Sequence, residues 1–205
     1  MELKAENVTF RYDRRSAPVL EHMNFSVRSG ERVGVFAPSG YGKSTLAMLL
    51  AGFYHPTEGK ILLDGQPLPE KGVCPVQLIY QHPEKAINPR WRLRQVLEES
   101  GQLDETVLRS FGIEPQWLSR FPRELSGGEL QRFCVARAIM SRPDFLICDE
   151  ISTMLDVITQ AQIWNVVLER AAENNMGLVV VTHNLELAKR ICTRIVDLTI
   201  PQEKE

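Results

Sequence analysis

A glycine-rich loop that contains a lysine is the part of this sequence best suited to chemistry. Residues 37–45 read Ala-Pro-Ser-Gly-Tyr-Gly-Lys-Ser-Thr and lie between the apolar runs 33–36 and 46–50. This order predicts a strand, a loop and a helix that Gly52 can end. Glycines let backbone N–H groups turn toward phosphate oxygens, the helix N-terminus adds partial positive charge, and Lys43 adds a full charge. Ser44 offers a hydroxyl to Mg²⁺, so the loop predicts binding of a nucleoside triphosphate.

The first position of this loop departs from the usual pattern, because Ala37 stands where a glycine is usual. Alanine has a Cβ and tolerates fewer backbone angles. A Gly/Ser-rich surface turn is the alternative, but such a turn needs no Gly-Lys-Ser-Thr run at the start of a helix. The expected nucleotide contacts of the loop are Ser39, Gly40, Tyr41, Gly42, Lys43, Ser44 and Thr45.

Two acids at the end of an apolar run form a second candidate site. Asp149 and Glu150 follow the run 145–148 directly. Strand ends in an open α/β sheet face the ligand crevice. We expect Asp149 to hold Mg²⁺ and Glu150 to orient and polarise the water that attacks the γ-phosphate, because phosphoryl transfer needs charge neutralisation and an in-line nucleophile.

A short motif at residues 125–129, Leu-Ser-Gly-Gly-Glu, predicts a helix start. Ser126 as N-cap and Glu129 three residues later form a capping box for a helix that runs toward Met140. Two glycines directly after a cap weaken a helix, so stability alone does not favour them. They fit a ligand that approaches the backbone closely, and the motif therefore predicts a second anion site.

The elements that must position these motifs read as an α/β fold. Alternating or turn-bounded segments predict antiparallel strands beside the phosphate loop, at 8–12, 19–27 and 60–63. Continuous apolar runs predict buried parallel strands at 77–80, 145–148 and 178–181. The stretch from about 90 to 140 has helical composition, with breaks at Pro115 and Pro122, and reads as a helical insertion.

Length and composition limit the class of protein. The 205 residues, 43% of them hydrophobic, suit one large domain or a core with an inserted subdomain. A net charge of -2 offers no basic field for nucleic acid. The four cysteines are scattered without a Cys-x-x-Cys pair, there is no secretory signal, and no apolar run is long enough to span a bilayer. We expect a cytoplasmic chain with buried thiols.

Together the motifs resemble those of ATP-binding cassette (ABC) ATPases, the nucleotide-binding subunits of ABC transporters. The similarity runs from about residue 2 to residue 198. Residues 125–129 resemble the family signature, with Glu129 where glutamine is commonest. Gln81 resembles the Q-loop glutamine that reaches Mg²⁺ and the attacking water, and His183 resembles the switch histidine that contacts the γ-phosphate.

Two further positions fit the same resemblance. Asp156 matches the D-loop aspartate, and Tyr12 matches the aromatic residue that stacks on adenine. Residues 150–156 read Glu-Ile-Ser-Thr-Met-Leu-Asp, so Ile151 stands where the family usually has proline, and we expect the stiffness of this loop to differ.

The resemblance implies an α/β fold, a P-loop NTPase (RecA-like) core with an N-terminal antiparallel β subdomain and an inserted α-helical signature subdomain. The core would comprise about residues 1–82 and 143–205, and the helical subdomain about 83–142. The implied catalytic residues are Glu150, His183, Gln81 and Asp156. The implied Mg²⁺ ligands are Ser44, Gln81 and Asp149. The implied nucleotide contacts outside the phosphate loop are Tyr12, Ser126, Gly127 and Gly128.

The family resemblance also implies partners. Two cassettes would pack head to tail, with each ATP held by Lys43 of one protomer and the Ser126 segment of the other. Residues 82–90 and 156–163 resemble the importers of dipeptides, oligopeptides and nickel. The implied function is an ATPase that uses ATP and Mg²⁺ to power an importer of peptides or nickel complexes. Its partners would be a second cassette, two permease subunits and, indirectly, a solute-binding protein, at the cytoplasmic face of the membrane and without nucleic acid.

Two other functions stay open at this point. A soluble cassette protein of DNA repair, chromosome organisation or translation usually carries coiled coils, zinc modules or tandem cassettes, and this sequence shows none of them. A regulatory cassette of the binding-only kind would bind ATP at a site that cannot hydrolyse it. Glu150 and His183 argue against it, whereas Ala37 and the altered 150–156 stretch leave room for it.

Two aromatic residues also have two interpretations each. Tyr12 alternates with Val8 and Phe10, so it is either a core aromatic of a strand or an adenine-stacking residue. Trp91 lies between two arginines in the segment 82–94. It either contacts a membrane subunit or packs the helical insertion onto the core.

Overall fold

A five-stranded parallel sheet forms the centre of the computed structural model, which describes residues 1–151 and 155–199. Its strands are β3 (Arg32–Phe36), β6 (Val76–Ile79), β7 (Phe145–Asp149), β8 (Gly177–Thr182) and β9 (Arg194–Asp197). The spatial order is β6-β7-β8-β3-β9, and every neighbouring pair is parallel. Every residue of β7 and β8 is buried, which explains their continuous apolar sequence. The predicted parallel strands are confirmed, and the edge strand β9 joins them.

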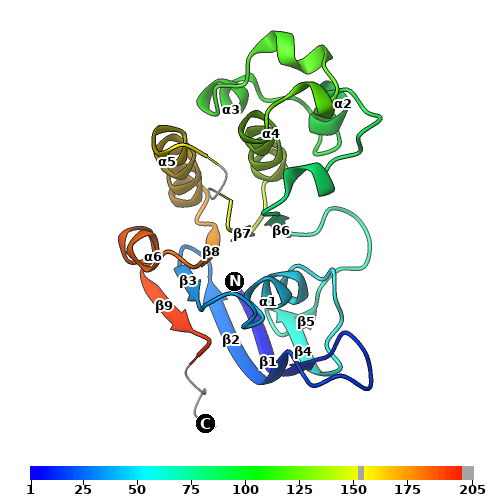
Figure 1. The fold of residues 1–205 in the computed structure, drawn as a ribbon, viewed down its shortest axis with the longest axis vertical. Helices are drawn as coiled ribbons and strands as arrows, with labels where there is room; N and C mark the ends of the chain where they lie inside the picture. Colours follow the sequence, from blue (N-terminus) through cyan, green and yellow to red (C-terminus); the bar gives the residue numbers. More distant parts are fainter. Residues whose placement is uncertain (152–154, 200–205) are drawn as a thin grey trace.

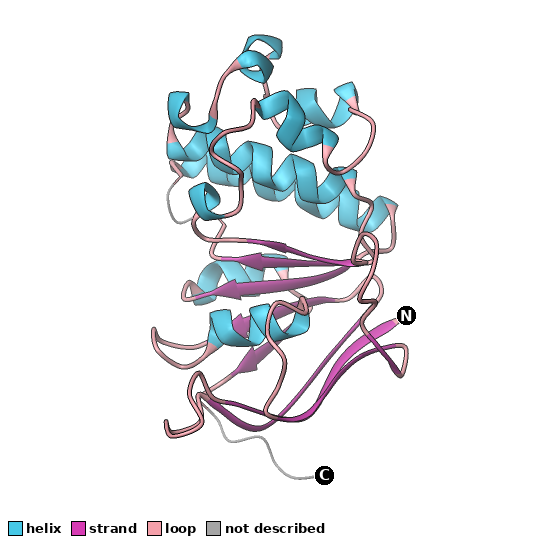
Figure 2. Cartoon of the chain, turned by 90° about the vertical axis from the view of Figure 1, so that its right-hand side faces the viewer, coloured by secondary structure: helices cyan, strands magenta, loops and turns pink. Residues whose placement is uncertain are grey.

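A second, antiparallel sheet lies at one end of the molecule, at the bottom of Figure 2. It consists of β1 (Glu2–Phe10), β2 (Leu20–Arg28), β4 (Glu58–Leu63) and β5 (Gln66–Pro67), in the order β2-β1-β4-β5. The strands predicted at 19–27 and 60–63 are therefore confirmed, whereas the strand predicted at 8–12 begins earlier and ends at Phe10. Side chains from β1, β2 and β3 pack with the helix α1 (Lys43–Leu50) in one apolar core, so this sheet supports the helix that follows the phosphate loop.

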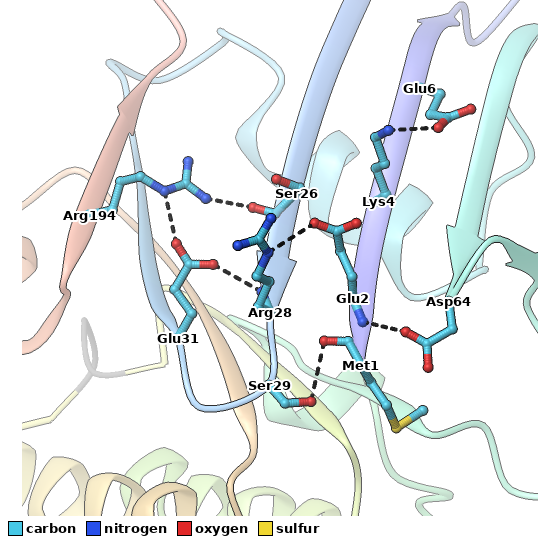
Figure 3. Close-up of polar contacts among 10 residues, drawn as sticks. All are labelled: Met1, Glu2, Lys4, Glu6, Ser26, Arg28, Ser29, Glu31, Asp64 and Arg194. Carbon is cyan, nitrogen blue, oxygen red and sulfur yellow. Dashed lines mark hydrogen bonds and ion pairs between the residues drawn. The ribbon is translucent and has the colours of Figure 1, made fainter.

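Polar contacts at the surface join the two sheets (Figure 3). Arg194 of β9 donates to Glu31 Oε1 at 2.9 Å and to the carbonyl oxygen of Ser26 in β2 at 2.7 Å. Arg28 Nε donates to Glu2 Oε1 at 3.3 Å, which connects β2 with β1. Exposed ion pairs contribute about 0–1 kcal/mol each, so these contacts fix alignment more than they stabilise the fold.

The remaining helices cover the other face of the parallel sheet or gather at the far end (top of Figure 1). The far end holds α2 (Leu93–Glu98), α3 (Glu105–Ser110) and α4 (Gly127–Met140), with short 3-10 turns at Pro83–Lys85, Pro115–Ser119 and Pro122–Glu124. Helices α5 (Val157–Glu173) and α6 (Leu185–Ile191) lie beside the sheet. Pro115 and Pro122 each begin a 3-10 turn, as expected for residues that break a helix.

A second apolar core joins α4 and α5 to the parallel sheet and contains the largest buried side chains of the helical part. Among the residues that the structure describes, no helix is both long enough and apolar enough to cross a membrane. The architecture is a P-loop NTPase fold with an antiparallel sheet at one end and a helical insertion at the other. The division at residues 83 and 142 stays our proposal.

Candidate nucleotide site

The phosphate loop needs glycine where its backbone turns. Gly40 and Gly42 have φ values of 89° and 82°, in the left-handed region that favours glycine. A Cβ on Gly42 would also lie 2.9 Å from Leu20 Cδ2. Ala37, in contrast, is fully buried and is not among the described residues with positive φ. An alanine therefore fits the first position of the loop without backbone strain.

Lys43 places its charge inside this loop. Its ammonium donates to the carbonyl oxygens of Ala37 at 2.7 Å and Pro38 at 3.0 Å, and the residue is only 6% exposed. An ammonium has three N–H donors, so these two bonds orient it and leave one for a phosphate oxygen. The geometry supports the predicted role of Lys43 in phosphate binding.

Asp149 and Ser44 have the chemistry of a magnesium site. Asp149 ends β7 and is 5% exposed, and burial raises its pKa although the hydrogen bond from Ser44 lowers it. Within the described part of the chain, the buried Oδ1 of Asp149 has no hydrogen-bond partner. A buried carboxylate oxygen without a partner beside a serine hydroxyl fits Mg²⁺, which prefers oxygen ligands and often shares one or two carboxylates with substrate phosphates.

Three predicted catalytic residues meet at the ends of β6, β7 and β8. Glu150 Oε1 lies 3.1 Å from His183 Nδ1, and Gln81 Nε2 donates to Glu150 Oε2 at 3.2 Å. Glu150 has a φ of 48°, and its N–H donates to the carbonyl oxygen of Val181 at 3.0 Å. A non-glycine residue in this conformation costs about 1–3 kcal/mol, which the surrounding sheet must supply. This conformation holds the Glu150 carboxylate between the side chains of His183 and Gln81.

A cleft of about 400 Å³ brings Gln81 and Glu150 together with the phosphate loop, whereas His183 is not among its lining residues. Its lining residues are Tyr12, Val19, Ser39, Gly40, Gly42, Lys43, Ser44, Thr45, Gln81 and Glu150. Of this set only Val19 was not predicted, because an apolar residue after a turn carries no chemical signal. Six of the seven predicted loop residues thus share one opening with Glu150, whereas Tyr41 is 50% exposed and is not among the lining residues.

Tyr12 stands at the rim of this cleft. It lies beyond the end of β1 and is 62% exposed, whereas Val8 and Phe10 are buried. The core interpretation of Tyr12 is therefore wrong: the strand ends at Phe10, and register shifts along β1 end the strict alternation. The Tyr12 hydroxyl lies 2.8 Å from Thr45 Oγ1, which ties the ring to the first turn of α1.

The motif around Ser126 lies away from this cleft. Ser126 caps α4 as predicted: its Oγ accepts from the N–H of Glu129 at 3.3 Å, and Glu129 Oε2 accepts from the N–H of Ser126 at 2.7 Å. A Cβ on Gly127 would meet nothing within 4 Å, so the fold itself does not require glycine there. No residue of this motif is among those that line the cleft.

The remaining predicted residue, Asp156, caps a helix. Its Oδ1 accepts from the N–H groups of Ile158 at 3.1 Å and Thr159 at 3.0 Å, so it begins α5. Ile151 is 2% exposed and belongs to the apolar core, which explains an apolar residue at that position. Residues 152–154, and with them the expected difference in loop stiffness, lie outside the described residues.

Comparison with known proteins agrees with this arrangement. The family model described as "ABC transporter" matches residues 20–153. The nickel import system ATP-binding protein NikE of Staphylococcus aureus strain bovine RF122 / ET3-1 is 36% identical over 96% of this chain and 86% of that protein. The same protein from strain USA300 is 35% identical over the same shares.

Solved structures show the same fold. The structure of an ATP-binding subunit of an ABC transporter has a TM-score of 0.81 and 26% identity, over 96% of this chain and 85% of that one. A dimeric bacterial ABC transporter cassette has a TM-score of 0.83 and 25% identity, over 95% and 93% of the two chains. The same cassette as a dimer bound to ADP and Pi has a TM-score of 0.82 and 25% identity, over the same shares.

The first prediction separates binding from hydrolysis. Lys43→Ala should weaken ATP binding about 10- to 100-fold, because a charge-assisted hydrogen bond is lost. Glu150→Gln should keep the affinity and lower kcat about 10²- to 10⁴-fold, because it keeps the shape and loses the base. Calorimetry and phosphate release measure the two effects, with Glu21→Gln on β2 as a remote control. Normal hydrolysis by Glu150→Gln would assign the base to another group.

The second prediction concerns the ring of Tyr12. Tyr12→Ala should weaken ATP and GTP alike, by the roughly 1–3 kcal/mol that base–aromatic stacking contributes in nucleic-acid proteins. Tyr12→Phe keeps the ring, loses the contact with Thr45, and should retain most of the affinity. Tyr12→Ala also removes the edge-on contacts of the ring with Phe10 and Tyr54, so Tyr12→Phe, which keeps them, is the variant that should leave thermal stability unchanged. A loss of thermal stability with unchanged nucleotide affinity would contradict the stacking role.

Proposed function

The chain belongs to the ABC transporter ATPase family and is the ATP-binding, ATP-hydrolysing subunit of an ABC importer; from this premise we propose that its cargo is nickel, free or in a complex. The cargo proposal rests on the 36% identity to a nickel import ATP-binding protein across 96% of the chain. Peptides are the other cargo class of the importer branch that residues 82–90 resemble. Hydrolysis itself is supported by the contacts of Gln81 and His183 with Glu150, which lines the same cleft as the phosphate loop.

The proposed chemistry divides among few side chains. Lys43 and the loop amides hold the β- and γ-phosphates, and Tyr12 stacks on the base. Mg²⁺ held by Ser44, Asp149 and the amide oxygen of Gln81 would neutralise phosphate charge. Glu150 orients the attacking water and accepts its proton, and its two neighbours fix the direction of the carboxylate. His183, whose side chain is more exposed than that of Glu150, would contact the γ-phosphate.

A second cassette completes the site in this proposal. The Ser126 motif offers a helix N-terminus and the accessible backbone of Gly127, but it lies outside the cleft of its own chain. A partner packed head to tail would bring its Ser126 motif to this ATP, and this chain would serve the partner's ATP in return. Similarity to a dimeric bacterial cassette supports this arrangement. Asp156, at the start of α5, would then act at the interface.

A groove beside the site is the proposed dock for permease subunits. It has a volume of about 590 Å³, and Phe53, Val73, Tyr80 and Arg137 are among its lining residues. Phe53 and Val73 are 60% and 63% exposed, so apolar surface is available to a partner. The chain would thus lie at the cytoplasmic face of a membrane, held there by the permeases and served indirectly by a solute-binding protein.

The segment 82–94 extends this surface. Trp91 is 37% exposed and is not among the residues of either apolar core, so part of its ring is available to a partner. Gln81 directly precedes the segment and contacts Glu150. Movement at the γ-phosphate would therefore reach whatever lies against residues 82–94.

The third prediction tests the shared site. Glu150→Gln with ATP should double the mass seen by light scattering, with the chain alone or with its partner cassette, because unhydrolysed ATP bridges two helix N-termini. Ser126→Arg should abolish this dimer and leave ATP binding by the monomer intact. Ser110→Arg, an exposed position on α3, is the matched control. If Ser126→Arg removed both dimer and monomer binding, the head-to-tail arrangement would be wrong.

The fourth prediction tests the importer itself. Arg90→Glu or Arg94→Glu should reduce nickel uptake by the assembled importer while the free cassette keeps its ATPase rate, since neither residue lines the cleft. Arg109→Glu, which reverses another exposed arginine on α3, should change neither rate. Uptake of radioactive nickel and of labelled dipeptides is measured in parallel. Dipeptide uptake without nickel uptake would overturn the cargo proposal, and full uptake by both variants would place the coupling surface elsewhere.

A further inference from the structure

One buried polar side chain of α4 has no part in the site described above. Gln131 is 3% exposed, and buried polar groups in folded proteins are almost always hydrogen-bonded. Its Nε2 donates to the carbonyl oxygen of Tyr80 at 3.3 Å. Tyr80 directly follows β6 and directly precedes Gln81, so this bond holds the backbone at the point where the Gln81 segment leaves the sheet.

Tyr80 is also held from the opposite side. Its hydroxyl donates to Met48 Sδ in α1 at 2.7 Å, and its ring meets Phe53 edge-on with 6.2 Å between the ring centroids. Burial raises the pKa of the Tyr80 hydroxyl, so it stays a donor at neutral pH. The helix of the phosphate loop therefore holds the side chain of Tyr80, and α4 holds its backbone.

The next residue of α4 points elsewhere. Arg132 donates to the carbonyl oxygen of Phe111 at 3.1 Å and to Thr159 Oγ1 at 3.4 Å, on the side of α5. The two neighbouring side chains thus connect α4 with different segments, and Gln131 is the one that contacts the backbone before Gln81.

We propose that Gln131 is a positioning residue for hydrolysis: it fixes the Gln81 segment against α4, and through Gln81 it sets the direction of the Glu150 carboxylate. The contacts run from Gln131 to Tyr80, along the chain to Gln81, and from Gln81 Nε2 to Glu150 Oε2 at 3.2 Å. This inference rests on the proposed function, because it takes Glu150 as the base.

Helix α4 connects Gln131 with the Ser126 motif, so movement at that motif would reach Gln131. Ser126 caps the N-terminus of α4, and Gln131 lies on the same fourteen-residue helix. Because a helix moves as a rigid body, a shift of α4 when Ser126 meets the partner's ATP carries Gln131 with it. Contact between the Ser126 motif of one chain and the partner's ATP would thus change the direction of the Glu150 carboxylate in that same chain.

The experiment removes the donor and keeps the volume. Gln131→Met has an unbranched chain of similar length without the amide, and Gln131→Glu offers an acceptor to the Tyr80 carbonyl in its place. Val135→Ala, at a fully buried position of the same helix, removes packing and leaves the bond. Gln131→Met should lower kcat about tenfold, the factor expected from one lost hydrogen bond, and change KM less than twofold. Gln131→Glu should lower kcat further.

A double-mutant cycle with Gln81→Ala tests whether Gln131 acts through Gln81. If it does, adding Gln131→Met to Gln81→Ala should change kcat less than twofold, because the segment no longer carries the group to be positioned. Additive losses would overturn the proposal, as would an unchanged kcat in Gln81→Ala. If Val135→Ala lowered kcat as much as Gln131→Met does, and the two variants had the same thermal stability, Gln131 would have only a packing role.

Hydrogen exchange gives a readout that does not depend on hydrolysis. In the full chain without nucleotide, Gln131→Met should speed amide exchange over residues 80–85, and Val135→Ala should not. Unchanged exchange in Gln131→Met overturns the inference whatever the ATPase rate. If instead the unmodified chain and its partner hydrolyse no ATP while this exchange difference is present, the proposed function fails and the positioning contact stands.

Discussion

Two buried charges of opposite sign, Lys43 and Asp149, impose the constraint on which the rest of this structure depends. They are 6% and 5% exposed, and a charge removed from water is costly unless partners surround it. The carbonyl groups of the loop satisfy part of the ammonium, and Ser44 satisfies part of the carboxylate. Phosphates and a divalent cation would satisfy the remainder, so the cost of burying these groups is the source of affinity for a charged ligand.

Each part of the fold positions a different residue of the site. The parallel sheet sets the distance between β3, which leads into the phosphate loop, and β7, which ends at Asp149. The antiparallel sheet packs against α1 and places Tyr12 at the rim of the cleft. The helical part carries Ser126 at the start of α4, and Ser126 is not among the residues that line the cleft.

The sequence predicted the features that depend on residues close together in the chain. It did not predict the features that depend on contacts between residues far apart in the chain. The buried runs of β7 and β8, the capping box of Ser126 and the glycines of the phosphate loop all follow from residue type and spacing. The exposure of Tyr12 depends on where β1 ends and on its register shifts, which pairing with β2 and β4 determines. The insertion of β3 between β8 and β9, and the bond from Gln131 to Tyr80, join residues far apart in the sequence and have no local pattern.

The position of β3 also bears on how the protein is made. Both neighbours of this strand come late in the chain, since β8 begins at Gly177 and β9 at Arg194. While a ribosome is still synthesising the middle of the protein, the strand that leads into the phosphate loop has neither edge paired. Such long-range pairing is slow to form, because the loop-closure entropy must be overcome before the contacts compensate for it. The growing chain therefore completes its nucleotide site late, and a chain interrupted before residue 177 carries the glycine-rich loop without either neighbour of β3 in the parallel sheet.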